Sequence, residues 1–100
     1  MRVEVRESCE DGVDVAFMSG QLNSTHAAQI RDLCISYVRH EKLVVDIDDV
    51  ESVSARAVSA WVEGQLLLEQ AGCELVLRRA SPQLRRTFEL YDPASVLTFQ

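Results

Sequence analysis

The acidic residues Asp46, Asp48, Asp49 and Glu51 form the densest group of side chains that could do chemistry. Carboxylate oxygens are ligands that Mg²⁺ prefers, so a magnesium cluster is one interpretation of this run. However, alternate residues on a strand and its following loop usually point apart or into water. We therefore interpret the run as a solvated strand end and predict no metal site.

The histidines and cysteines do not form a ligand set either. His26 and His40 stand 14 positions apart on one predicted helix, which is nearly four turns, so they cannot share a metal there, and we predict both at the surface. Cys9, Cys34 and Cys73 are an odd number without a Cys-x-x-Cys pair, which argues against a disulfide framework and against zinc. We expect Cys34 in the core and Cys9 in a polar loop.

Ser54 and Arg56 stand at the start of a predicted helix. A serine at this place typically caps the helix by accepting a backbone hydrogen bond, and we favour that role over modification; Ser52 is a second candidate for capping. A cation in the first turn opposes the helix dipole by about 0.3–1 kcal/mol, which suggests a functional reason for Arg56. No nucleophile with a neighbouring base and no glycine-rich phosphate loop is visible. The sequence thus predicts no catalytic residue, no enzyme activity and no cofactor.

The elements that position these residues follow from periodicity. Apolar residues alternate with polar ones near both ends of residues 2 to 19, around a Glu-Asp-Gly turn, which predicts a β-hairpin that includes Val3 and Val5. Asn23, Ser24 and Thr25 are helix-capping types, and an apolar stripe from Ala27 to Val38 follows them. A buried strand at 43–47 follows, and then a helix from near Ser54 to Gly72 with Trp61 on its packing stripe and Ser59 on its polar face. After a strand at 75–77, the next helix begins at Ser81-Pro82 and packs through Leu84, Phe88 and Tyr91. A last strand is predicted at 96–99.

This order, β-β-α-β-α-β-α-β, predicts an α/β fold with a mixed, mostly parallel sheet, an N-terminal hairpin and three amphipathic helices. The length of 100 residues suits a single domain over 1–100, and the 47% apolar content indicates an ordinary packed core. The net charge of −6 repels a phosphate backbone and argues against a nucleic-acid partner. Apolar runs are far shorter than the roughly 20 residues that span a bilayer, so we expect a cytoplasmic protein without membrane insertion.

Several segments resemble STAS domains such as the sporulation anti-sigma-factor antagonist. Asp46–Val50 (Asp-Ile-Asp-Asp-Val) resembles the family's Asp-Leu-Ser-Gly-Val run, and Gly20–Asn23 (Gly-Gln-Leu-Asn) resembles Gly-Glu-Leu-Asp before its first helix. The Ala71–Leu77 segment is similar to the family's glycine-then-strand element, and the Ser81–Arg86 segment to its next helix start. The spacing agrees without a gap from Asp46 to Arg86.

The resemblance implies a protein-binding surface and an altered switch. It places Ser54–Ala57 where the family carries Asp-Ser-Ser-Gly, whose second serine is the usual phosphate acceptor, and that position is Arg56 here. Arginine has no hydroxyl, so the usual phosphoserine switch cannot be carried over; Ser54 remains the possible acceptor. The predicted partner-binding residues are Asn23, Ser24, Thr25, Ser52, Ser54, Ala55, Arg56 and Ser59.

Three functions are compatible with this resemblance. The first is a non-catalytic regulatory module that docks a kinase-like anti-sigma factor, which is an ATPase-fold serine kinase, or another signalling partner. The second is the STAS subunit of a bacterial phospholipid-transport ABC system, which binds the ATPase subunit, because Leu90–Leu97 resembles the C-terminal segment of that subunit. The third is a sensor of a nucleotide or another small molecule. The sequence leaves a homodimer open.

Overall fold

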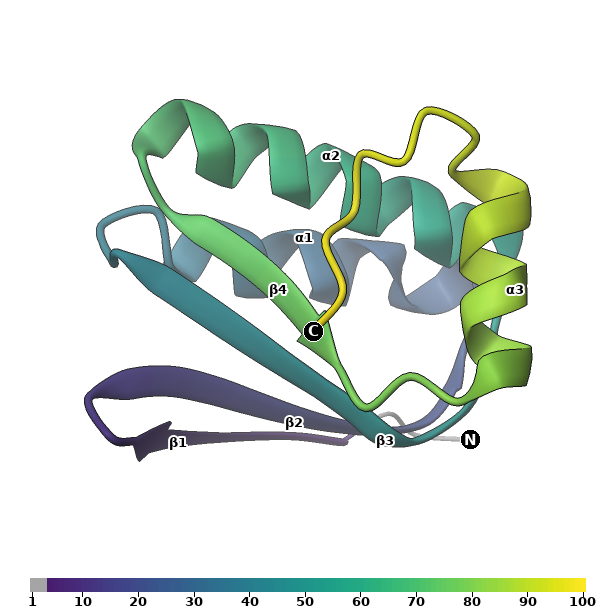
Figure 1. Cartoon of the computed structure of the whole chain (residues 1–100), viewed down its shortest axis with the longest axis horizontal. Coiled ribbons are helices and arrows are strands. Elements are labelled where there is room, and N and C mark those ends of the chain that lie inside the picture. Colours follow the sequence, from purple (N-terminus) through teal and green to yellow (C-terminus); the bar gives the residue numbers. More distant parts are fainter. Residues whose placement is uncertain (1–3) are drawn as a thin grey trace.

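The chain folds into a four-stranded sheet with helices α1 and α2 on one face and helix α3 at one end of the sheet (Figure 1). This computed structural model describes residues 4–100, so Val3 of the predicted hairpin lies outside the described residues. The strand order is β1-β2-β3-β4, in which β1 is antiparallel to β2 and the other neighbours are parallel. The predicted α/β fold with a mixed, mostly parallel sheet is confirmed.

The N-terminal hairpin consists of β1 (Glu4–Glu10) and β2 (Val13–Leu22). Asp11 and Gly12 form its turn with φ angles of 51° and 79°, the left-handed conformations that Asp-Gly supplies in two-residue hairpins. β2 continues beyond the predicted end at residue 19 because its second half pairs with β3. Cys9 lies exposed within β1, so its prediction as a loop residue is wrong.

The centre of the sheet is β3 (Lys42–Val53), with β4 (Glu74–Arg78) on its other side. Ala16, Val45 and Leu77 stand side by side in register and are fully buried under the helices. β3 is covered on both faces in its first half, because Val44 on the opposite face is also buried. The predicted strand at 43–47 is therefore correct in kind, but it runs on to Val53.

Two helices cross over the sheet and pack closely together. α1 (Ala27–Ser36) follows the short 3-10 helix η1 (Ser24–His26), and α2 (Ala55–Ala71) ends at Gly72, whose φ of 83° terminates the helix. A Cβ atom on Gly64 of α2 would clash with the Cys34 Sγ of α1, so glycine permits this approach. Cys34 and Trp61 are fully buried, as predicted.

The C-terminal part differs from the prediction in two places. In α3 (Pro82–Tyr91), capped by Ser81, Leu84 and Phe88 are buried, but Tyr91 at the last position is 44% exposed. The predicted last strand at 96–99 is only an isolated parallel bridge between Leu77 and Phe99. The reason is local: the Asp92 carboxylate accepts hydrogen bonds from the backbone N–H groups of Val96 and Leu97, which holds this segment in a turn.

No helix within residues 4–100 combines the length and apolar character that crossing a membrane requires.

Candidate functional site

The two predicted parts of the site, the Asn23–Thr25 segment and the start of α2, lie together at the carboxyl ends of β2 and β3. Leu22 pairs with Val53 in the parallel register, and the Ser54 N–H donates to the Leu22 carbonyl oxygen at 2.8 Å. The segment after β2 therefore lies beside the start of α2. We call this area the α2-start surface; its residues are Asn23, Ser24, Thr25, Ser52, Ser54, Ala55 and Arg56.

The part of this surface that follows β2 is a tight cap. The Asn23 Oδ1 accepts hydrogen bonds from the Thr25 backbone N–H at 3.0 Å and from the Thr25 Oγ1 at 2.6 Å. The His26 Nδ1 in turn accepts the Asn23 backbone N–H at 3.1 Å, which completes a capping box. His26 is buried, so its prediction as a surface residue is wrong. The Asn-x-x-His spacing, read as a capping box, was the signal that could have placed it.

Ser54 caps α2 as the sequence predicted. Its backbone is extended, with φ −86° and ψ 163°, and its Oγ accepts the Ala57 backbone N–H at 3.2 Å. Ser52, in contrast, lies in β3 opposite Gln21 and is exposed, so the idea that it shares the capping is wrong. Ser54 thus satisfies one of the backbone N–H groups that a helix start leaves without a partner inside the helix.

Arg56 gives the α2-start surface its positive charge. It stands in the first turn of α2 and is exposed, as its neighbour Ala55 is. No hydrogen bond or ion pair from another residue of the described range 4–100 reaches its guanidinium. The positive pole of the helix dipole adds to this charge, so the spot suits a carboxylate or a phosphate group.

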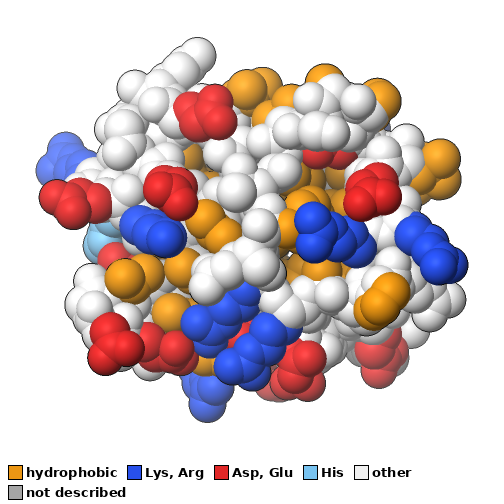
Figure 2. Space-filling view, viewed as in Figure 1, with side chains coloured by type: hydrophobic (Ala, Val, Ile, Leu, Met, Phe, Trp, Pro, Cys, Tyr) orange, Lys and Arg blue, Asp and Glu red, His pale blue; other side chains and the backbone are white. Residues whose placement is uncertain are grey.

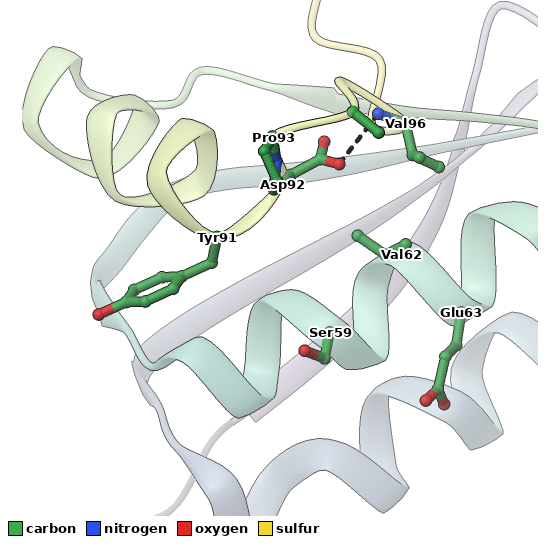
Figure 3. A pocket seen from close by; sticks show the side chains of 8 residues that line it. Ser59, Val62, Glu63, Tyr91, Asp92, Pro93 and Val96 are labelled. Atoms are coloured by element: carbon green, nitrogen blue, oxygen red, sulfur yellow. Dashed lines mark hydrogen bonds between the residues drawn. The ribbon is translucent and has the colours of Figure 1, made fainter.

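Ser59, the remaining predicted residue, is exposed one turn further along α2 and borders a groove (Figure 3). α2 forms one wall of the groove, and the end of α3 with the segment after it forms the other wall. Its volume is about 330 Å³. Sequence reasoning missed this groove, because its walls are distant in the sequence. The lining residues are Ser59, Val62, Glu63, Tyr91, Asp92, Pro93, Ala94 and Val96.

The acidic run on β3 does not converge on a common point. Asp46 is only 2% exposed; its carboxylate accepts the Asp48 backbone N–H at 3.0 Å and the Arg78 Nε at 2.8 Å. The Asp49 and Glu51 side chains are exposed. Arg78 also donates to both carboxylate oxygens of Glu10, at 3.3 and 3.4 Å. These bonds, first to Asp46 and then to Glu10, raise the pKa of the Arg78 guanidinium above its ordinary value. Asp46 therefore links β3 to the end of β4, where the Arg79 Nε also approaches its Oδ2 at 3.4 Å.

Two of the three thiols, those of Cys34 and Cys73, are buried and poorly nucleophilic. Burial, helped by the nearby Cys73, raises the pKa of the Cys34 thiol to about 12. Burial also raises the pKa of Cys73. Because the thiolate is the nucleophilic form of cysteine, neither buried thiol is suited to nucleophilic catalysis near neutral pH.

Residues 7–98 match the family described as "Mlab, STAS domain", and the chain belongs to this STAS family. Solved structures with the same fold are an anti-sigma factor antagonist from Mycobacterium paratuberculosis (21% identity, 98% of this chain and 85% of that chain covered, TM-score 0.76) and a variant of RsbS from Moorella thermoacetica (20%, 96% and 85%, 0.74). A third is the phosphorylated form of the Bacillus cell fate determinant SpoIIAA (14%, 97% and 91%, 0.68). A comparison with curated proteins finds no match.

Proposed function

We propose that this chain is a non-catalytic regulatory module that binds a protein partner through the α2-start surface and Ser59. The partner of best fit is a kinase-like anti-sigma factor or another signalling protein with an acidic residue at its docking edge. The observation that carries the proposal is Arg56: an exposed arginine at a helix N-terminus with no acceptor among residues 4–100. Its charge is available for another molecule.

Support for this class of partner comes from the relatives. Two structures with this fold are an anti-sigma factor antagonist and a phosphorylated SpoIIAA. In this chain the arginine at position 56 supplies a permanent positive charge in place of a switchable hydroxyl, so the proposed binding is not controlled by phosphate there. Phosphate on Ser54 would keep an acceptor for the Ala57 backbone N–H and would add negative charge at the start of α2. We place this interaction in the cytoplasm.

Affinity capture from native cell extract, followed by mass spectrometry, tests the proposal. The wild-type chain is expected to recover an ATPase-fold or signalling protein. Arg56→Glu should weaken this interaction by about tenfold or more, because it sets a carboxylate against an acidic partner. Arg39→Glu is the matched control, since Arg39 is also exposed but lies after α1, away from the α2-start surface. Equal loss with both variants, or none with either, would contradict the proposal.

A second candidate is the STAS subunit of a phospholipid-transport ABC system, which would bind its ATPase subunit through the same surface. The description of the matched family as "Mlab, STAS domain" favours this candidate. Neighbouring genes discriminate: adjacent lipid-transport permease and ATPase genes would favour it, and adjacent sigma-regulator genes the first candidate. The same capture experiment would then recover an ABC ATPase.

A further inference from the structure

The groove beside Ser59 has the character of an apolar receptor site. Five of its eight lining residues are apolar or aromatic: Val62, Tyr91, Pro93, Ala94 and Val96. Figure 3 shows Val62 of α2 facing the segment that carries Val96, with Tyr91 to one side. A volume of about 330 Å³ is at the lower end of ligand pockets, which range over roughly 300–1,000 Å³, so it suits one or two large side chains.

The charged groups of the groove already have hydrogen-bond partners inside the molecule. The Glu63 Oε2 accepts from the Arg31 Nη2 at 2.8 Å. The two carboxylate oxygens of Asp92 accept from the backbone N–H groups of Val96 and Leu97 at 3.0 and 2.9 Å. Neither carboxylate therefore requires a cation from a ligand, and the complementary group for this groove is apolar.

Apolar surface also continues outside the groove. Leu66, one turn after Val62 on α2, is 46% exposed. In Figure 2 apolar side chains show along the upper edge of the molecule, over α2 and the segment that follows α3. Burial of such surface is favourable by about 25 cal/mol per Å², which gives a partner a reason to cover it.

The groove adjoins the unpaired charge at the start of α2. Ser59 follows Arg56 by three residues and Val62 follows it by six, which is about 4.5 to 9 Å along the helix axis. A partner helix spaces side chains four residues apart by about 6 Å on one face. One short segment can therefore reach both places, with a carboxylate on Arg56 and an apolar side chain in the groove.

We infer that the groove receives a large apolar side chain from a partner helix whose Asp or Glu, about four residues away, contacts Arg56. This inference rests on the proposed function and names the chemistry of the partner segment. A second copy of the chain is a poorer occupant. Two such copies repel each other with a net charge of −6 each, and an isologous contact would bring the same Arg56-bearing surfaces together.

The test uses phage-displayed random peptides of about twelve residues, selected on the wild-type chain. Ser59→Trp fills the groove from α2, and Ala94→Trp fills it from the opposite wall; both positions are exposed. Gln70→Trp, exposed on α2 and outside the groove, is the control. Circular dichroism and thermal melting verify that each variant folds, and fluorescence polarisation measures affinity.

The expected peptides carry an apolar residue about four positions from an acidic one. Both groove-filling variants should weaken their binding about tenfold or more, and Arg56→Ala about threefold or more, whereas Gln70→Trp should leave it unchanged. Peptides that lose affinity with Arg56→Ala but not with Ser59→Trp or Ala94→Trp would overturn the inference about the groove and leave the proposed function standing. Peptides that lose affinity with Ser59→Trp and Ala94→Trp but not with Arg56→Ala would overturn the inference that one partner segment contacts both the groove and Arg56. A selection that yields no peptide affected by any of these variants would overturn it as well. A wild-type dimer that both fillings convert to a monomer in size-exclusion chromatography with light scattering would identify a second copy as the occupant and overturn it as well.

Discussion

Arg56 and Arg78 both stand where a strand of the sheet gives way to the next element, yet their surroundings are opposite. The Arg78 side chain is 16% exposed, lies against the Phe17 ring and donates to both Asp46 and Glu10. Arg56 is exposed and, within residues 4–100, has no acceptor for its five N–H groups. The two residues carry the same charge in the same kind of place.

The difference indicates which charge serves the fold and which is available for binding. The Arg78 guanidinium compensates the carboxylate of Asp46, which burial would otherwise make costly. Arg56 compensates no other residue of the described part and opposes the helix dipole, so the folded state does not depend on it. A charge that the fold does not use is the better candidate for contact with a partner.

The same substitution at both arginines tests this difference, and the larger effect is expected at Arg78. Arg78→Glu places a third carboxylate beside Asp46 and Glu10, and it leaves the buried Asp46 charge with only the exposed Arg79, whose Nε lies 3.4 Å from the Asp46 Oδ2. We expect a loss of roughly 3–5 kcal/mol in the free energy of unfolding, measured by urea denaturation. Many domains have only about 5–15 kcal/mol in total, so this variant should be the least stable. A loss below about 1 kcal/mol would show that the network does not hold the sheet together.

A milder change isolates Asp46. Asp46→Asn keeps the size of the side chain but removes its charge, while Arg78 retains Glu10 as a partner. The free energy of unfolding should fall by about 1–3 kcal/mol. Asp48→Asn is the matched control, because Asp48 is the next acid on β3 and is exposed; it should change the stability by about 0.5 kcal/mol or less. Equal effects of both variants in denaturation would contradict a structural role for Asp46.

The contrast between the arginines also marks how far the sequence could predict the molecule. The start of α2 was predictable because its signals are local: a capping serine, an apolar strand before it and a glycine at the far end of the helix. The Asp46–Arg78 contact joins residues 32 positions apart, and only the parallel register of β3 and β4 makes them neighbours. No local pattern carries that information.

Other errors have equally physical causes. The apolar spacing in α3 predicted that Tyr91 would pack inward, but the helix ends at Tyr91 and the chain turns away through Asp92. The apolar residues after it suggested a strand, yet the Asp92 carboxylate binds two of the backbone N–H groups that a ladder would need. The groove of Ser59 exists because of this turn. It was invisible in the sequence for the same reason that the strand prediction failed.

The cap of α2 provides a smaller test on the binding side of the comparison. Ser54→Ala removes the acceptor for the Ala57 N–H, and it should lower the free energy of unfolding by about 1 kcal/mol. Ser54→Asp, which keeps an acceptor and adds a negative charge at the helix N-terminus, should retain the wild-type stability or exceed it. Ser52→Ala serves as the control because Ser52 makes no such cap. Thermal melting of the four proteins decides whether Ser54 is a structural residue of this surface.

Arg56→Glu should have the smallest effect on stability and the opposite sign to Arg78→Glu. It removes a cation from the positive end of the α2 dipole and supplies an anion, each favourable by about 0.3–1 kcal/mol at low ionic strength. We expect a net gain of about 0.6 kcal/mol in urea denaturation at low salt, the low end of the summed range because position 56 is exposed, and a smaller gain at high salt, because salt screens exposed charges. A loss of stability would reveal an acceptor that Arg56 serves in the folded state, and its charge would then no longer be free for a partner. A gain together with weaker partner binding would show that this arginine is retained for recognition at the expense of the helix that carries it.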